Sequence, residues 1–230
     1  MKPVQNHAWD ISPTEAVSLQ KQLAPQVITE DIPNFSPRFI AGVDVAYIED
    51  SPCLFAAVVV LRADDLSVVD MSTAYCHVQF PYVPTLFSFR ELPPIMAALS
   101  HLTQRPDLII CDGQGRAHPQ RFGLASHLGV LYDVPTIGCA KKSLIGQYEP
   151  PAEQRGAYTI LHDDNGQQSQ EVIGQVVRTQ VGIKPIFVSV GHRISLDTAR
   201  HWVVHCSPRY RLPETTRQAD QAVNYLKRCY

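Results

Sequence analysis

The sequence lacks an excess of charge of either sign. Its 230 residues carry 20 Lys and Arg against 22 Asp and Glu, which gives a formal net charge of −2 and a pI near 6.5. This balance argues against a protein that is held to nucleic acid mainly by its overall charge. Total charge says nothing about how the charges are distributed, so the sequence still allows a local basic groove.

Long hydrophobic runs and paired cysteines are also missing. The longest apolar runs, such as 54–61, have the length of a strand and fall well short of a membrane span. The first residues contain no apolar segment typical of a signal peptide. The six cysteines show neither a CxxC motif nor the Cys/His spacing of a zinc site. We therefore expect a reduced, soluble, cytoplasmic protein that does not enter a membrane.

Length and composition predict a single domain over residues 1–230. Hydrophobic residues make up 45% and charged residues 18% of the chain, which is ordinary for a globular domain. The chain is long enough to bury a sizeable core. No internal repeat, low-complexity segment or linker divides it.

Apolar patterns predict an antiparallel meander in the first part of the chain. A capping box at Ser12–Glu15 begins a helix that ends before Pro25. Strands are then expected at 39–47, 54–62 and 67–79. Their short connections make them antiparallel neighbours.

The following segments predict parallel pairing and a hairpin. We expect a helix over 91–102, a strand over 106–112, a helix over 121–132 and a strand over 134–139, an order typical of parallel strands joined by a crossover. Strands over 157–161 and 171–179 flank a polar turn at 163–166. A strand over 186–190, a helix over 195–205 and a helix from Glu214 complete the chain. This order predicts an α/β fold of the ribonuclease H-like class, with a mixed sheet flanked by helices.

Two carboxylates lie at neighbouring strands of this predicted sheet. Asp44 lies inside an apolar strand, and Asp112 ends the buried strand that precedes Gly113. In a ribonuclease H-like fold these strands are neighbours, and hard oxygen ligands at adjacent strand ends are typical of a magnesium site. Two alternatives remain open: Asp44 could cap a backbone amide, and Asp112 could belong to an ordinary Asp-Gly turn.

Glu91 is the candidate for a third ligand. It follows the stiff, proline-rich loop Phe80–Pro84 and stands at the predicted start of a helix. The alternative is that Glu91 only complements the positive end of that helix, with Ser88 in a capping box. Spacing alone does not decide between these interpretations.

Several stretches of the chain, taken in order, resemble the endonuclease V family of nucleases, which cut strands containing deaminated adenine. Each stretch alone is a weak signal, but the ordered set is specific and runs from the first strand to the last helix. The matching stretches are Ile40–Asp44, Phe80–Pro84, Ser88–Glu91, Asp112–Pro119, Gly123–His127, Asp133–Lys142 and Arg211–Arg217.

The resemblance implies a DNA repair endonuclease that requires Mg²⁺, with Mn²⁺ as a substitute. It would hydrolyse the second phosphodiester bond 3′ to deoxyinosine and leave 3′-hydroxyl and 5′-phosphate ends. The implied metal ligands are Asp44, Glu91 and Asp112, joined by Asp220 on the last helix, where some relatives carry His. The implied role of Lys141 is contact with the scissile phosphate or the attacking water; without the resemblance it would be interpreted as a surface lysine.

The resemblance also implies a pocket for a base rotated out of the stack. Tyr82, held between two prolines, would fill the gap that the base leaves. His118 and His127 could each contact the lesion strand or orient neighbouring groups. Glycines would let the backbone approach the base closely. These glycines are Gly113, Gly115 and Gly123. The more ordinary interpretations are a packed tyrosine, turn glycines and, for His127, a core histidine.

One position departs from the family pattern. Thr85 follows the Pro-Tyr-Val-Pro loop where the family carries glycine, and a β-branched residue narrows the freedom of the backbone there. A close backbone contact at this point is therefore in doubt, whereas the metal chemistry is unaffected.

The expected partner is DNA that contains deaminated bases, bound by a monomer. One alternative is the same site acting on inosine-containing RNA, which only contacts to the ribose would distinguish. The other is a nucleic-acid binding module that has lost its chemistry. That module would be expected to have broken carboxylates, and Asp44, Glu91 and Asp112 are all present.

Overall fold

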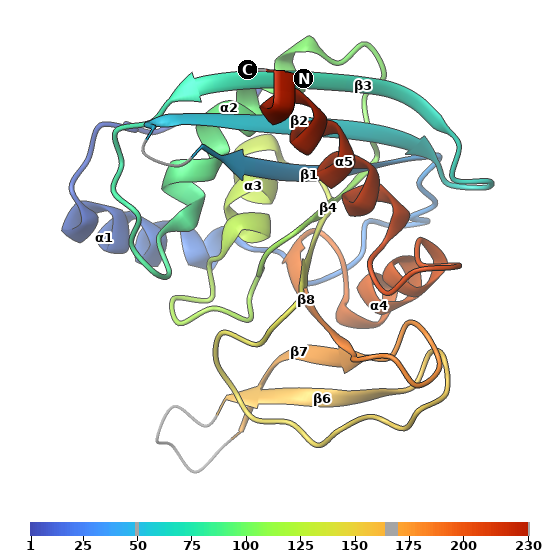
Figure 1. Cartoon of the computed structure of the whole chain (residues 1–230). Coiled ribbons are helices and arrows are strands. Elements are labelled where there is room, and N and C mark those ends of the chain that lie inside the picture. The colour runs from blue at the N-terminus through green and yellow to red at the C-terminus, as the bar shows by residue number, and fades with distance from the viewer. Residues whose placement is uncertain (49–50, 164–169, 230) are drawn as a thin grey trace.

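An eight-stranded mixed sheet with helices on both faces forms the structure, a computed structural model that describes residues 1–48, 51–163 and 170–229 (Figure 1). The strands follow the order β3-β2-β1-β4-β5-β8-β7-β6 across the sheet. They are β1 (Phe39–Tyr47), β2 (Cys53–Arg62), β3 (Val68–His77), β4 (Leu108–Cys111), β5 (Thr136–Ala140), β6 (Tyr158–Asp163), β7 (Glu171–Val177) and β8 (Ile186–His192).

The helices divide between the two faces of this sheet. Helices α2 and α3 pack on one face and α4 and α5 on the other, while α1 lies beside α3. Their bounds are α1 (Pro13–Leu23), α2 (Phe87–His101), α3 (Leu124–Tyr132), α4 (Leu196–His205) and α5 (Glu214–Cys229), and a short 3-10 turn, η1, covers Ala24–Gln26.

The strand pairing confirms the predicted ribonuclease H-like fold. Strand β1 pairs antiparallel with β2 and parallel with β4, and β4 pairs parallel with β5. Val43 is opposite Cys111 in the parallel register, so Asp44 and Asp112 each follow the last paired position. The fold therefore brings these two carboxylates to one edge, as the sequence predicted.

Alternation along β1 sends its side chains to the two faces in turn. Val43 is buried in a cluster with residues of α2, whereas Ala46 packs with Val223 of α5. By this alternation Asp44 lies on the α5 face. A Cβ on Gly42 would lie 2.1 Å from the backbone oxygen of Thr215, so glycine is required for α5 to cross so close to β1.

Helix α2 begins earlier than predicted. It starts at Phe87 and not at 91, and it contains Pro93 and Pro94 in its interior. Packing overrides the poor helix propensity of the prolines, because Phe89 is buried and the Ser88 hydroxyl contacts the ring of His127 (3.0 Å). No acidic residue lies in the first turn, so the interpretation of Glu91 as a helix N-terminal charge in a Ser88 capping box is wrong.

Helix α3 begins later than predicted. Arg121 has a φ of +53°, which no α-helical residue adopts, and its guanidinium binds Glu171 and Asp163. Gly123 is the N-cap, and the helix starts at Leu124. The hairpin of β6 and β7 is confirmed, whereas positions 164–166 of its predicted turn lie outside the described residues.

The remaining predicted helices and strands are present, with ends that lie within about two residues of the predicted ones. The capping box of Ser12 and Glu15 is present in α1, and α5 begins at Glu214. All six cysteines are free, and four of them are buried. Within the described ranges no helix is both long enough and apolar enough to cross a membrane.

Candidate active site

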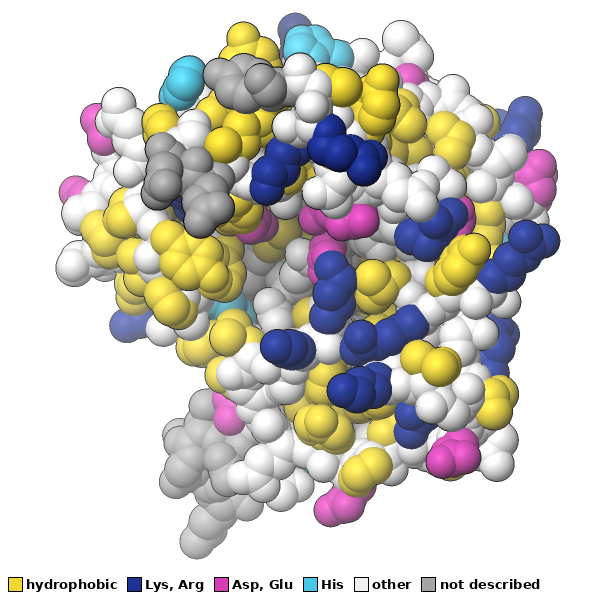
Figure 2. Space-filling model, viewed as in Figure 1, with side chains coloured by type: hydrophobic (Ala, Val, Ile, Leu, Met, Phe, Trp, Pro, Cys, Tyr) yellow, Lys and Arg dark blue, Asp and Glu magenta, His cyan; other side chains and the backbone are white. Residues whose placement is uncertain are grey.

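Carboxylates from separate elements line one pocket at the carboxyl ends of β1 and β4, which we call the acidic pocket. Lys141, which follows β5, lines the same pocket. Figure 2 shows acidic side chains in a hollow at the centre of this face, bordered by Lys and Arg side chains. The carboxylates are Asp44 of β1, Glu91 of α2, Asp112 after β4 and Asp220 of α5. The structure thus brings together the residues that the sequence proposed as metal ligands.

Asp44 lies close to two other negative charges. Burial raises the pKa of Asp44 to about 7, and the charges of Asp112 and Asp220 act in the same direction. The amide of Val45 donates to Asp44 Oδ1 (2.9 Å), which partly stabilises the ionised form. An acid that is so costly to ionise beside other acids is typical of a site that receives a cation.

Glu91 lies deeper in the pocket, against Tyr47. Burial raises the pKa of Glu91 to about 7, and the charge of Asp112 adds to the effect. The Tyr47 hydroxyl donates to Glu91 Oε1 at 2.7 Å and favours the ionised form. The guanidinium of Arg90 lies 5.4 Å from the Tyr47 ring centroid and donates to the Phe80 carbonyl oxygen (2.6 Å). Glu91 is therefore oriented by neighbours that also hold the loop 80–84.

Lys141 places a positive charge against one of the acids. Its ammonium Nζ lies 2.5 Å from Asp112 Oδ2. Burial alone would lower the pKa of Lys141, but the hydrogen bond and charge of Asp112, together with Asp44 and Asp220, raise it. Arg211 holds the backbone here, since its Nη2 donates to the Lys141 carbonyl oxygen at 2.8 Å.

The donor chemistry of this pocket fits a divalent cation. Its four acids are hard oxygen ligands, which Mg²⁺ and Mn²⁺ prefer, and the two lysines that line the pocket, Lys141 and Lys227, cannot neutralise them all. In the described part of the chain no three His, Cys, Asp or Glu side chains are already arranged to hold a metal ion. Two of the acids instead have protein partners, since Asp112 is paired with Lys141 and Glu91 with Tyr47.

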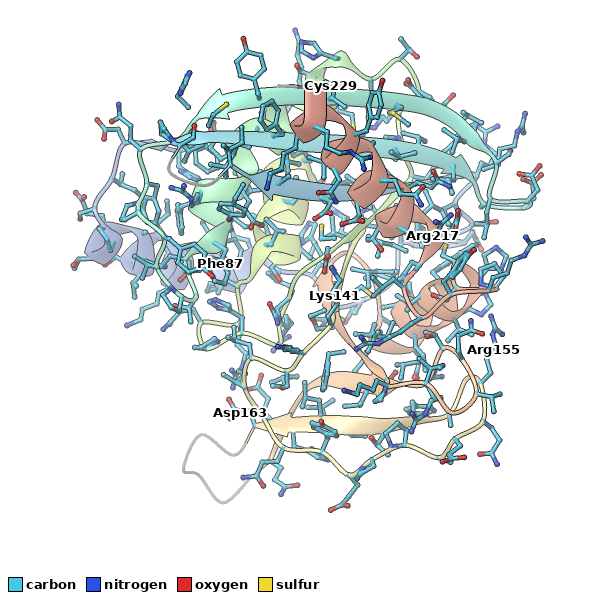
Figure 3. All side chains as sticks on the ribbon, viewed as in Figure 1. Phe87, Lys141, Arg155, Asp163, Arg217 and Cys229 are labelled. Carbon is cyan, nitrogen blue, oxygen red and sulfur yellow. The ribbon has the colours of Figure 1, made fainter. Side chains whose placement is uncertain are left out.

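A second pocket adjoins the first and shares Glu91, Asp112 and Lys141 with it. We call it the lesion pocket, after the base pocket that the sequence resemblance implies. Its volume of about 340 Å³ lies in the range of small-molecule sites. In Figure 3, Phe87 of this pocket lies to one side of Lys141. The other lining residues are Thr85, Ser88, Gly113, Gln114, His118, Gly123, Leu124, Ala140, Lys142 and Leu144.

His118 forms part of the wall of the lesion pocket. Its Nε2 lies 2.8 Å from the Thr85 carbonyl oxygen, and its Nδ1 accepts from the Gln120 amide (3.2 Å). These partners define a neutral tautomer with the proton on Nε2. Burial lowers the pKa of His118 to about 4, which favours the same neutral form.

Thr85, the departure from the family pattern, has a φ of +73°, a region that favours glycine. Its carbonyl oxygen accepts from Gln20 Nε2 (3.1 Å) and from His118. These two hydrogen bonds hold the strained backbone in place, and they already occupy the Thr85 carbonyl oxygen.

The three candidate glycines do not have the same surroundings. Gly113 and Gly123 line the lesion pocket, whereas Gly115 does not. A Cβ on Gly115 would lie 2.1 Å from the Val190 carbonyl oxygen, and its amide donates to Ser189 Oγ (2.9 Å). Gly115 is therefore explained by its packing against β8.

Tyr82 is 65% exposed at the tip of loop 80–84, beside the lesion pocket. Its ring centroid lies 5.0 Å from that of Phe87 and 6.3 Å from that of Tyr47. His127, in contrast, is fully buried, with contacts to His7 (2.7 Å) and Ser88 (3.0 Å). The ordinary interpretation therefore holds for His127, and Tyr82 is free to contact a ligand.

Sequence reasoning missed Tyr47 and Asn224. Asn224 lines the acidic pocket, and its Nδ2 donates to Asp220 Oδ1 at 3.0 Å. Its spacing of four residues from Asp220 on a helix was a usable signal, because such residues share one face. Tyr47 and Glu91 are 44 positions apart and carry no local signal.

Comparisons with known proteins agree with this arrangement. The family model of endonuclease V matches residues 21–221. The endonuclease V of Trichormus variabilis is 48% identical over 222 residues, which cover 96% of this chain and 98% of that protein.

Solved structures of the same family are similar in fold. Endonuclease V from Streptomyces avermitilis superposes with a TM-score of 0.89 at 46% identity, over 96% of this chain and 95% of that one. Endonuclease V of Ciona intestinalis, in complex with a 24mer DNA containing an inosine followed by a ribo-adenosine, gives a TM-score of 0.79 at 28% identity. This match covers 94% of this chain and 98% of that one.

Proposed function

Because the chain belongs to the endonuclease V family of nucleases, we propose that it is a DNA repair endonuclease specific for deaminated bases, chiefly deoxyinosine. It hydrolyses the second phosphodiester bond 3′ to the lesion and leaves 3′-hydroxyl and 5′-phosphate ends. The Ciona intestinalis relative bound to inosine-containing DNA supports this substrate class.

The observation that carries the proposal is the junction of two pockets. Glu91, Asp112 and Lys141 line both the acidic pocket and the lesion pocket. A base that enters the lesion pocket therefore draws its own strand across the carboxylates. Recognition and hydrolysis then occur at fixed positions along one strand, as a cut at a set distance from the lesion requires.

Base recognition uses the backbone of the lesion pocket. Hypoxanthine carries a carbonyl oxygen and an N1–H where adenine carries an amine and an acceptor. Gly113 and Gly123 let backbone donors and acceptors approach these edges, while His118 shapes the wall. Since both ring nitrogens of His118 already have protein partners, its ring does not read the base. Tyr82 fills the space that the rotated base leaves in the stack.

The cofactor of this proposal is Mg²⁺, with Mn²⁺ as a substitute. Asp44, Glu91 and Asp112 hold it, with Asp220 beside them. When bound, the metal supplies an activated water for attack on phosphorus and charge to stabilise the leaving 3′ oxygen. Lys141 remains protonated, because its pKa is raised, and it contacts the scissile phosphate.

A second candidate is cleavage of inosine-containing RNA by the same site. The ribo-adenosine that follows inosine in the Ciona intestinalis complex favours it. Only contacts to a 2′-hydroxyl would separate the two substrates. Matched oligonucleotides that differ in sugar alone, cut in competition, decide between them.

The test of the proposal is cleavage of oligonucleotides with a single deoxyinosine or a single inosine, in Mg²⁺. We expect the wild type to cut, Asp44→Asn to lose activity by at least about 100-fold, and the exposed-site control Asp64→Asn to cut like wild type. Failure of the wild type to cut either strand would refute the proposal. So would an Asp44→Asn variant as active as wild type.

A further inference from the structure

We propose that Tyr210, held by Arg217, forms a stacking subsite for a nucleobase of the substrate strand, 3′ of the cut. This inference rests on the proposed function, since it places a further nucleotide of the same strand. The subsite lies on the side of Lys141 opposite to Phe87 of the lesion pocket.

Tyr210 is an exposed aromatic ring in a fixed position. Its side chain is 52% exposed, and the guanidinium carbon of Arg217 lies 4.6 Å from the ring centroid. Arg217 is fixed in turn, because its Nε and Nη2 donate to the two carboxylate oxygens of Glu214 at 2.8 and 2.5 Å. The Tyr210 carbonyl oxygen accepts from Gln180 (3.1 Å). Little side-chain freedom is left to lose when a ligand binds.

The residue that follows Tyr210 contacts the active site directly. Through Nη2, the Arg211 side chain donates to the Lys141 carbonyl oxygen at 2.8 Å. Arg217 and Asp220 lie one turn apart on α5. In Figure 3, Phe87 and Arg217 lie on opposite sides of Lys141. A strand that leaves the lesion pocket and crosses the carboxylates therefore continues towards Tyr210.

The chemistry of the pair suits a nucleobase of any sequence. Bases stack on aromatic rings and on arginine planes, and every base offers such a face. An arginine beside a tyrosine adds cation–π attraction and a positive charge near the backbone phosphates. Since the proposed cut lies 3′ to the lesion, the nucleotide that reaches Tyr210 lies 3′ of the cut. Stacking also supplies affinity that a chain of net charge −2 does not gain from overall charge.

The chain contains a matched control pair. The guanidinium carbon of Arg200 lies 3.8 Å from the Tyr158 ring centroid, Arg200 donates to Asp197 at 2.7 Å, and Tyr158 is 44% exposed. Its local chemistry thus repeats that of Tyr210 and Arg217. Tyr158 lies in β6, however, at the far edge of the sheet, with β7, β8, β5 and β4 between it and β1.

The experiment measures binding of single-stranded deoxyinosine oligonucleotides by fluorescence anisotropy, in EDTA so that the strand stays intact. We expect Tyr210→Ala to raise the Kd by about 10-fold, Tyr210→Trp to bind like wild type, and Tyr158→Ala to cause no change. The rescue by tryptophan separates loss of stacking from loss of folding. Thermal melting of each variant provides an independent check of the fold.

A second series replaces single nucleotides 3′ of the cut by abasic sites. One position should weaken wild-type binding about as much as Tyr210→Ala does, and the same abasic site should have no further effect in that variant. The proposal is overturned if Tyr210→Ala binds like wild type, or if Tyr158→Ala weakens binding equally. A wild type that binds but does not cut in Mg²⁺ would instead refute the proposed function and leave this binding comparison intact.

Discussion

The Tyr47 hydroxyl donates a 2.7 Å hydrogen bond to Glu91 Oε1, and the Tyr47 ring also lies edge-on to the ring of Tyr82. One side chain therefore contacts both a proposed metal ligand and the residue proposed to replace the rotated base. This hydrogen bond orients the Glu91 carboxylate. It also stabilises the charged form of Glu91, which burial disfavours and which a cation requires.

Tyr47→Phe removes this hydrogen bond and keeps the ring. We expect the Mg²⁺ concentration for half-maximal cleavage to rise by about 10-fold, since partners of metal ligands contribute on this scale. A metal titration of cleavage rates measures the effect. The control is Tyr75→Phe, an exposed tyrosine of β3, which should not change the titration. An unchanged metal requirement in Tyr47→Phe would contradict the orienting role.

Tyr82→Ala tests whether Tyr82 fills the space that the rotated base leaves in the stack. Tyr82 is 65% exposed and contributes little to the core, so the variant should fold normally. We expect its affinity for a deoxyinosine duplex to fall by about 10-fold, with a smaller change for a single strand, where no stack has to be filled. Tyr225→Ala, at a tyrosine with 67% exposure on α5, is the matched control. Equal affinity of Tyr82→Ala and wild type for the duplex would exclude this role of Tyr82.

The helices and strands that carry the site residues could be predicted from the sequence more fully than the contacts between those residues. Asp44 and Asp112 could be paired in advance, because an apolar run and a meander order define neighbouring strands. The place of Glu91 could not be read correctly, because the helix was expected to start at 91, whereas it starts at Phe87 and buries Phe89 ahead of Glu91. Contacts such as that between Tyr47 and Glu91 depend on tertiary structure and leave no periodic pattern.

The resemblance to the endonuclease V family likewise indicated which residues belong to the site, but it did not show what surrounds each of them in the fold. Gly113 and Gly115 both appeared as pocket glycines, yet only Gly113 lines the lesion pocket. The backbone of β8, which is distant in sequence, is what requires glycine at position 115.

This difference gives a stability prediction. A Cβ at position 115 would meet the Val190 backbone oxygen at 2.1 Å, whereas at position 113 the nearest atom is the flexible Leu124 side chain at 3.3 Å. We expect Gly115→Ala to lower the free energy of unfolding by about 3 kcal/mol and Gly113→Ala by less than about 1 kcal/mol. Urea denaturation measures the free energy of unfolding of both variants. Equal losses would contradict the close approach of the β8 backbone to Gly115.

His118 predicts a dependence of stability on pH. Its pKa is about 4 in the folded protein and near 6.5 when unfolded, so the unfolded state binds the extra proton. The stabilisation is fully present above about pH 6.5 and is lost as the pH falls towards 4. Between about pH 7.5 and pH 5 the wild type should lose about 2 kcal/mol more than His118→Gln. Other histidines contribute to both proteins and cancel, and an identical loss in both would show that His118 is not held neutral.

Mapping the product ends of a 5′-labelled strand with one deoxyinosine, incubated in Mg²⁺ or in EDTA, tests the central claim most directly. We expect one cut in Mg²⁺, at the second phosphodiester bond 3′ to the lesion, with a 3′-hydroxyl on the labelled fragment, and no cut in EDTA. Cleavage that persists in EDTA, that falls elsewhere, or that is equal on a strand without deoxyinosine would contradict it.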